Sequence, residues 1–219
     1  MEYIPGGVCA AKGFTAAGVH CGVKKKKNAL PGTEEKKDLA LIVSAVPCAA
    51  AGVFTRNQVK AAPVLLDIDR LQSGRAQALA VNSGNANACA LLGMENALRM
   101  GKAAADVLGL DEALVLVGST GVIGQTLNIE AIEKGLPGAA AALSEGGSDD
   151  ASAAIMTTDT VPKTEAVRFE VAGVPVCLGG IAKGSGMIHP NMGTMLCYLT
   201  TDCAIEPALL QKACAGRRT

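Results

Sequence analysis

The sequence contains no tryptophan, and aromatic residues make up only 2% of its 219 residues. It also has no excess of either charge, because 20 Lys and Arg residues are balanced by 20 Asp and Glu residues. General nucleic-acid binders present a basic surface, and proteins that bind single strands need aromatic rings for base stacking. Both absences argue against a nucleic-acid partner.

Long apolar runs and paired cysteines are missing as well. No apolar run approaches the roughly 20 residues of a membrane span, and the start Met-Glu-Tyr-Ile-Pro-Gly-Gly is unlike a secretory signal. The eight cysteines include no Cys-x-x-Cys pair, and His20 and Cys21, as adjacent strand residues, would point to opposite faces. We therefore predict a cytoplasmic protein without a membrane partner or a metal site. Its cysteines should be reduced and mostly in the core.

What the chain does have is small aliphatic residues, and 49% of it is hydrophobic. A chain of this length can bury a sizeable core in one domain or two small ones. Apolar runs predict strands, helical spacing predicts helices, and Ala172-Gly173 is expected to close a hairpin. The expected strands are 39–46, 63–66, 76–81, 113–117, 166–171 and 174–178; the expected helices are 89–108 (capped by Asn87), one from about 129, 151–156 and 207–214.

One glycine-rich stretch leads directly into an apolar run. Gly184 and Gly186 allow backbone angles that other residues resist, and Pro190 fixes its own φ. Residues 194–200, Thr-Met-Leu-Cys-Tyr-Leu-Thr, predict a buried strand. Thr194 therefore stands where a flexible loop meets a rigid strand, as an N-terminal threonine nucleophile must. On spacing alone, a glycine turn before a β-branched strand residue is the more common explanation.

Cleavage of the Gly193–Thr194 bond would make Thr194 the first residue of a new chain. Its hydroxyl would then lie beside its own free α-amine, which is the threonine form of nucleophile activation. A free α-amine has a pKa of roughly 7.7–8.0, and partial burial lowers it, so the neutral amine can act as a base near neutral pH. Attack of the Thr194 hydroxyl on the Gly193 carbonyl could start the cleavage.

Two other segments place polar or glycine residues at the ends of predicted strands. Residues 82–88, Asn-Ser-Gly-Asn-Ala-Asn-Ala, either face a polar ligand or fix a loop. Residues 118–124 have glycines three apart and no phosphate-loop lysine, which argues against a nucleotide cofactor. We expect a tight strand-to-helix turn there, which either packs the chain or offers N–H groups to an oxyanion. Cys197 and His189 are a further candidate pair, although the apolar context predicts that Cys197 is a core residue.

The sequence Lys183-Gly-Ser-Gly-Met-Ile-His-Pro-Asn-Met, with the Thr-Met-Leu-Cys and Leu-Thr-Thr-Asp that follow, closely resembles the self-cleaving ornithine acetyltransferase family. These are the glutamate N-acetyltransferases of arginine biosynthesis, made as one chain that cuts itself before a threonine. The stretch 82–88 is also similar to a signature of this family. One residue departs from the pattern, since Gly193 stands where the family has alanine. We expect this to affect the speed of cleavage more than its location.

The resemblance implies an α/β fold, a layered sandwich of mixed sheets and helices of the N-terminal-nucleophile type. Its implied activity is acetyl transfer from N-acetylornithine to glutamate through an acetyl-threonine intermediate. No cofactor is implied, and acetyl-CoA is a candidate co-substrate because some members use it. The implied site residues are Thr194 as the nucleophile, Gly193 and Thr194 as the cleavage site, Thr120 and Gly121 as the oxyanion hole, and Thr157, Lys183 and Thr194 as substrate-binding residues.

Two other functions stay open at this point. One is a self-processing N-terminal-threonine amidohydrolase or aminopeptidase, and the other is an incomplete, inactive domain that only keeps the fold. The resemblance covers nearly all of this chain but only the first portion of the family's sequence. We expect residues 1–193 to form an α-chain region and residues 194–219 to begin a β-chain region that is truncated here. At full length the family suggests a heterotetramer of two α and two β chains.

The missing portion bears on activity. In the family it supplies an acidic residue and C-terminal polar residues to the substrate site. A strand and one short helix, which are all that follow Thr194 here, bury little surface by themselves. We therefore predict that residues 1–219 alone are poorly active, and robust acetyl transfer by this purified chain would contradict the prediction.

Overall fold

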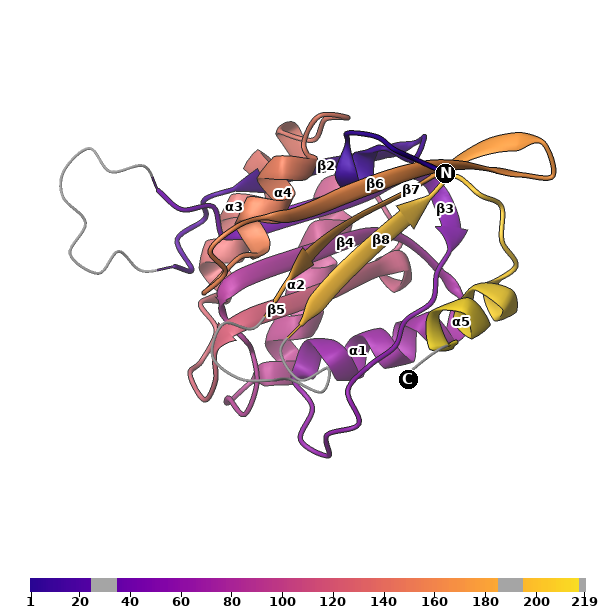
Figure 1. Cartoon of the computed structure of the whole chain (residues 1–219). Coiled ribbons are helices and arrows are strands. Elements are labelled where there is room, and N and C mark those ends of the chain that lie inside the picture. Colours follow the sequence, from indigo (N-terminus) through magenta and orange to yellow (C-terminus); the bar gives the residue numbers. More distant parts are fainter. Residues whose placement is uncertain (25–34, 185–194, 217–219) are drawn as a thin grey trace.

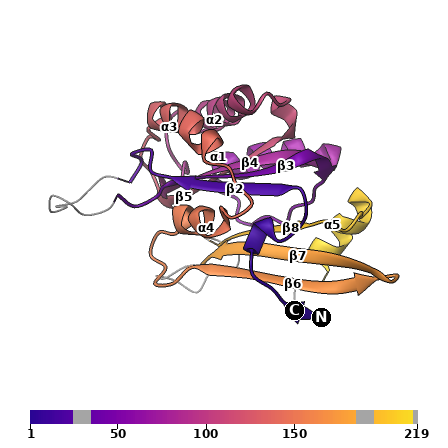
Figure 2. The same ribbon diagram turned by 90° about the horizontal axis from the view of Figure 1, so that it is seen from above.

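A computed structural model describes residues 1–24, 35–184 and 195–216. The described chain forms two stacked four-stranded sheets, with three helices covering the far side of one of them (Figure 1 and Figure 2). The strands are β1 (Glu2–Tyr3), β2 (Phe14–Val19), β3 (Leu39–Ala49), β4 (Arg75–Asn85), β5 (Val115–Val122), β6 (Lys163–Val171), β7 (Val174–Lys183) and β8 (Leu196–Thr201). The α-helices are α1 (Ala62–Arg70), α2 (Gly93–Leu108), α3 (Ile129–Ala141), α4 (Ser148–Ile155) and α5 (Pro207–Ala215).

The two sheets differ in how their strands run. The central sheet has the order β2-β3-β4-β5, in which β4 and β5 are parallel and the other neighbours antiparallel. The outer sheet has the order β1-β6-β7-β8 and is antiparallel throughout. Its β6-β7 hairpin closes through Ala172 and Gly173, whose φ values of 50° and 79° suit a two-residue hairpin turn. The predicted layered α/β sandwich of mixed sheets is confirmed.

Strand β3 shows how the layers are held together. Successive side chains of a strand point to opposite faces, and both faces of this strand are covered. Leu39 and Leu41 belong to the core that packs under α1, α2 and α3. Ala40 and Ile42 belong to the core between the two sheets, to which α4 also contributes. In Figure 2, α1, α2 and α3 lie on one side of the central sheet and the outer sheet lies on the other.

Three sequence-based predictions of local structure are wrong. Residues 63–66 were predicted as a strand but lie in the first turns of α1, where Pro63 near the amino-terminal end is compatible with a helix. Helix α2 begins at Gly93 after Leu92, so Asn87 is not its cap. Residues 118–122 continue β5, and a loop separates them from α3 at Ile129, so no tight strand-to-helix turn forms there.

Helix α1 also shields the free edge of the central sheet. Strand β5 lies at that edge, so some of its backbone groups have no neighbouring strand in the described chain. The buried Asp67 carboxylate accepts a hydrogen bond from the Val117 N–H at 2.9 Å. Arg70 donates to the Val115 carbonyl and, at 2.8 Å, to Glu112. Two side chains of one helix therefore pair with two backbone groups at this edge, the Val117 N–H and the Val115 carbonyl.

Asp67 should make stability depend on pH. Burial raises the pKa of its carboxyl group to about 7, although the hydrogen bond from Val117 and the charge of Arg70 oppose the rise. The unfolded pKa is about 3.9, so between about pH 4 and pH 7 the native chain keeps a proton that the unfolded chain has released. The free energy of unfolding is therefore highest below about pH 4, where Asp67 is protonated in both states, and it falls as the pH rises to 7. The expected loss is up to about 4 kcal/mol.

The measurement is urea unfolding from pH 4 to pH 8 with Asp67→Asn, which keeps an oxygen acceptor for Val117. We expect the free energy of unfolding of the wild type to fall relative to this variant across the window. Asp69→Asn is the matched control, because Asp69 is an exposed acid on the same helix. Parallel curves for the wild type and Asp67→Asn would contradict the assignment.

Candidate active site

Strands β7 and β8 carry the two ends of the segment that contains the predicted nucleophile. Lys183 ends β7 and pairs in register with Leu196, which begins β8. Gly193 and Thr194 themselves lie outside the described residues. Met195, the residue directly after Thr194, is described and exposed. The predicted strand after Thr194 is therefore present as β8, next to Lys183. It is not buried as predicted, because Cys197 and Leu199 are exposed on a strand that has the second sheet on one side only.

Lys183 is buried, with only 3% of its surface exposed. Its Nζ atom donates to the Gly184 carbonyl at 2.7 Å and lies 3.9 Å from Asp159 Oδ2. Burial lowers the pKa of Lys183, and the nearby Asp159 carboxylate opposes this effect. A buried ammonium held by one carboxylate is suited to binding a second anionic group, such as the carboxylate of an amino acid.

Asp159 joins two residues that the resemblance assigns to the substrate site. Its side chain accepts hydrogen bonds from the backbone N–H groups of Gly184, at 2.7 Å, and Thr157, at 3.3 Å. Lys163 Nζ donates to the same carboxylate at 2.8 Å. Burial alone would raise the pKa of Asp159, but these hydrogen bonds and the charge of Lys183 lower it to about 2. The structure thus brings Thr157 and Lys183 together around a carboxylate that stays ionised.

Thr120 and Gly121 lie near the carboxyl-terminal end of β5, in the central sheet. Thr120 is buried and pairs in register with Ser83 of β4. The Ser83 hydroxyl donates to the carbonyl of Ala154 in α4, three residues before Thr157. Ser83 therefore connects the strand that carries Thr120 to the helix that precedes Thr157.

Gly121 occupies a position that only glycine suits. Its φ is +133°, and a Cβ atom added there would overlap the carbonyl carbon of Gly84 on the neighbouring strand. Residues with a side chain rarely adopt this backbone angle. The close approach of the two glycines brings the ends of β4 and β5 together at the site.

The asparagine residues at the end of β4 hold the neighbouring strand and loops in place. Asn82 Nδ2 donates to the Asn85 carbonyl at 3.0 Å, and its Oδ1 accepts from the Ser119 hydroxyl at 2.6 Å. Asn85 Nδ2 donates to the carbonyls of Gln125 and Thr126, at 3.1 and 3.3 Å. Of the two roles left open by the sequence, the structure supports the structural one.

Tyr198 connects the outer sheet, which carries Lys183, to the central sheet, which carries Thr120. It belongs to β8, pairs in register with Ile181 of β7, and packs against the core between the sheets. A Cβ atom at Gly118 of β5 would overlap the Tyr198 hydroxyl. Gly118 stands two residues before Thr120, and Ile181 two residues before Lys183. The ring of Tyr198 therefore fixes the strand that follows Thr194 relative to the strand that carries Thr120.

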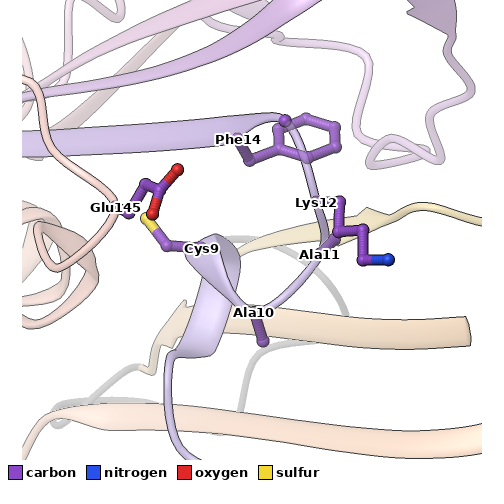
Figure 3. A pocket seen from close by; sticks show the side chains of 7 residues that line it. Cys9, Ala10, Ala11, Lys12, Phe14 and Glu145 are labelled. Atoms are coloured by element: carbon purple, nitrogen blue, oxygen red, sulfur yellow. The ribbon is translucent and has the colours of Figure 1, made fainter.

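A cavity of about 290 Å³ lies elsewhere, near Cys9 and Glu145 (Figure 3). Its wall includes Phe14 at the start of β2, which is the end of the central sheet opposite to Thr120. In Figure 3 Lys12 points away from Cys9 and Glu145. Burial raises the pKa of the Cys9 thiol, and the Glu145 charge adds to the rise, so Cys9 is a poor nucleophile. This cavity is therefore a weaker candidate for the active site than the cluster around Lys183.

The prediction that the cysteines are mostly core residues is wrong. All eight are unpaired, and none is fully buried. Cys197 is exposed, and its candidate partner His189 lies outside the described residues. The described residues contain no group of three or more His, Cys, Asp or Glu side chains placed to bind a metal ion. None of the described helices is both long and apolar enough to cross a membrane.

Comparison with known proteins decides the family, because the ArgJ family model matches residues 15–217. The chain belongs to the ArgJ family. It is 51% identical to the arginine biosynthesis bifunctional protein ArgJ of Symbiobacterium thermophilum and 50% identical to that of Caldanaerobacter subterraneus. Each match covers 97% of this chain and 52% or 51% of the relative, so the chain spans about half the length of the curated ArgJ proteins it matches.

Solved ArgJ structures have the same fold. The ArgJ protein of Bacillus halodurans matches with a TM-score of 0.75 and 41% identity, over 87% of this chain and 95% of that one. Ornithine acetyltransferase from Mycobacterium tuberculosis, solved with ornithine, matches with a TM-score of 0.76 and 39% identity. This match covers 89% of this chain and 99% of that one. An aminopeptidase of Ochrobactrum anthropi with a variant N-terminal-nucleophile hydrolase fold matches with a TM-score of 0.55 and 13% identity, which shows a shared fold alone. The expected N-terminal-nucleophile-like architecture is confirmed.

Asp159 is the site residue that sequence reasoning missed. It lies within the polar run 157–160, but nothing in the local pattern distinguishes it from a turn residue. Its partners Lys163 and Gly184 come from two different strand ends. The one available signal was that an acid stands two residues after the threonine that the resemblance selects.

Proposed function

We propose that this chain is the amino-terminal part of an acetyltransferase that moves the acetyl group of N-acetylornithine to glutamate. The chain is cleaved between Gly193 and Thr194, and Thr194 then carries the acetyl group between the two substrates. The observation that supports this best is the cluster of Lys183, Asp159 and Thr157 beside β8, the strand that begins two residues after Thr194.

The lengths of the matched proteins support cleavage. The chain covers 99% of the solved Mycobacterium tuberculosis chain but only 52% of the curated Symbiobacterium thermophilum protein. A solved chain about half as long as a curated relative is expected if ArgJ proteins are divided near residue 194 of this sequence. The Mycobacterium tuberculosis structure contains bound ornithine, which fits an amino-acid substrate here.

The chemistry has two acyl-transfer steps. The α-amine of Thr194 takes the proton of its own hydroxyl, and Oγ attacks the acetyl carbonyl of N-acetylornithine. The Thr120 hydroxyl and the Gly121 N–H hold the oxyanion, which collapses as the ornithine nitrogen leaves with the proton from the α-ammonium. The glutamate amine then attacks the acetyl ester, gives its proton back through the α-amine to Oγ, and leaves as N-acetylglutamate.

The charged cluster positions both substrates. N-acetylornithine and glutamate share an α-carboxylate, and Lys183 supplies a buried ammonium group to bind it. Asp159 limits the freedom of Lys183 and holds Thr157 close to it. One binding mode for the common part of both substrates lets the acetyl group occupy the same place in each step.

Replacing Thr120 by alanine should slow acetyl transfer without unfolding the chain. Removal of one oxyanion-hole donor typically lowers kcat by about 10²- to 10³-fold. Thr120→Ser is the matched control, because it keeps the hydroxyl, and we expect it to stay within about 10-fold of the wild type. The measurement is steady-state formation of N-acetylglutamate by protein extended to the length of its relatives. Equal rates for the alanine and serine variants would contradict a role for the hydroxyl.

Amide hydrolysis is the second candidate, since the aminopeptidase of Ochrobactrum anthropi shares the fold. The test is incubation with N-acetylornithine, with and without glutamate. Transfer predicts N-acetylglutamate formation that depends on glutamate, whereas acetate release that is independent of glutamate would indicate hydrolysis.

The proposal also includes assembly of two α and two β chains into a heterotetramer. Light scattering of the full-length protein measures the mass of this assembly.

A further inference from the structure

A second lysine, Lys24, lies in a loop that is fixed to the same end of the central sheet. The fully buried carboxylate of Asp38 accepts hydrogen bonds from the N–H groups of Cys21, Gly22 and Lys24, at 2.6, 3.2 and 2.8 Å. The carbonyl of Asp38 in turn accepts from the Ser83 N–H of β4 at 2.9 Å. The position of the Lys24 backbone is therefore set by β4 itself.

The side chain of Lys24 lies against the glycines at the site. A Cβ atom added to Gly84 would lie 3.0 Å from Lys24 Cγ. Gly84 pairs in register with Gly121 of β5, with which it is in close contact. Only one glycine therefore separates the Lys24 side chain from the predicted oxyanion residue.

The Lys24 ammonium is in an unusual environment for a lysine. Its Nζ atom donates to the Lys37 carbonyl at 2.7 Å. Burial lowers the pKa of Lys24 to about 8, and neighbouring charges act on it in both directions. The titratable groups that face it are Asp38 and Cys21, which raise the pKa, and Lys36 and Lys183, which lower it. The charge of Lys183 is thus one of those that act on Lys24.

We propose that Lys24 is a second cation of the active site and acts with Lys183 to select an acceptor with two carboxylates. The inference rests on the acetyl transfer proposed above. Lys183 comes from the outer sheet and Lys24 from the loop after β2, so the two cations approach from different layers. Two ammonium groups that repel each other are both stabilised when a dianionic acceptor binds between them. Glutamate meets this requirement, whereas glutamine, which has a neutral side chain, does not.

Competitive acetylation of the protein extended to the length of its relatives tests the proposal directly. Trace acetic anhydride modifies only neutral amines, so the modified fraction of each lysine against pH, read by mass spectrometry, reports its protonation. We expect the peptide containing Lys24 to show a component with a midpoint near pH 8, which is absent from Lys24→Arg. L-glutamate should shift this midpoint upward and reduce the reactivity of Lys24 at least 10-fold, whereas L-glutamine should not. The exposed Lys102 is the internal control.

Substitutions give a second measurement that does not depend on labelling. Lys24→Met, which keeps the length of the side chain, should weaken binding of L-glutamate by roughly 10- to 100-fold and leave binding of L-glutamine unchanged. Lys24→Arg should retain the preference for glutamate and remove its loss above about pH 8, because arginine does not titrate there. Thermal unfolding of each variant shows whether it is folded, and labelling of the wild type decides the question if Lys24→Met is not.

The outcomes separate this inference from the proposed function. Protection of Lys183 by glutamate with no change at Lys24, or equal effects of glutamate and glutamine on Lys24, would overturn the role of Lys24 and leave acetyl transfer standing. If neither N-acetylornithine nor glutamate affected either lysine, both proposals would be contradicted. Glutamate-specific protection of Lys24 supports both.

Discussion

Replacing Thr194 by alanine is expected to abolish both backbone cleavage and acetyl transfer. Alanine has no hydroxyl to attack the Gly193 carbonyl, and without cleavage no free α-amine is produced at this position. The nucleophile and its base act as a unit, so losing the nucleophile leaves only the catalysis provided by substrate binding and the oxyanion hole. We therefore expect turnover to fall by at least about 10⁴-fold. The measurement is N-acetylglutamate formation by protein extended to the length of its relatives.

Thr194→Ser is the control for this experiment. Serine keeps both the hydroxyl and the α-amine that cleavage would release, so cleavage and transfer should continue at reduced rates. Circular dichroism of both variants should match the wild type, because each substitution changes only a few side-chain atoms. Turnover and processing that survive in Thr194→Ala would show that another group, and not this hydroxyl, performs the chemistry.

Gly121→Ala is expected to have the largest effect on stability. The new Cβ atom would overlap the carbonyl carbon of Gly84, and a side chain at a φ of +133° is strained even in open space. Strain of this kind costs about 1–3 kcal/mol and overpacking about 1–3 kcal/mol more, so we expect a loss of roughly 2–6 kcal/mol in the free energy of unfolding. Urea unfolding measures it.

Gly124→Ala is a matched control three residues further along the chain. Gly124 also has a positive φ, of 79°, but no atom lies within 4 Å of the position of an added Cβ. Its substitution should therefore cost only the backbone strain, about 1–2 kcal/mol. Because Gly121 also carries the proposed oxyanion N–H, acetyl transfer should fall far more in Gly121→Ala than in Gly124→Ala. Equal effects of the two substitutions would contradict the close contact between β4 and β5.

Local patterns predicted those elements whose cause is local. The long apolar run that begins at Leu39 became β3, and Ala172-Gly173 became a hairpin turn because two adjacent residues adopt positive φ values. The four residues from Pro63 were assigned the wrong element, because a short apolar run fits a strand and one face of a helix equally well. Their membership of α1 depends on packing over β5, which a sequence window does not contain.

The residues of the candidate site also divide into those that sequence reasoning found and those that depend on tertiary contacts. Lys183 and Thr157 were found because the resemblance marks them, and the structure places them around one carboxylate. Asp159 and the loop at Lys24 were missed because their roles depend on contacts made across the fold, with Lys183 and Gly184 for Asp159 and with Gly84 for Lys24. The cysteines were misplaced for a related reason, since the core is filled by aliphatic residues that the two sheets and the helices bring together. Partners of this kind are set by tertiary structure.

The most direct test of the account is the intact mass of purified wild-type residues 1–219, followed by sequencing of any new amino terminus. Cleavage before Thr194 predicts two fragments, one ending at Gly193 and the other beginning with Thr194. A single uncut species with Thr194 in place, or a new terminus at any other residue, would contradict it.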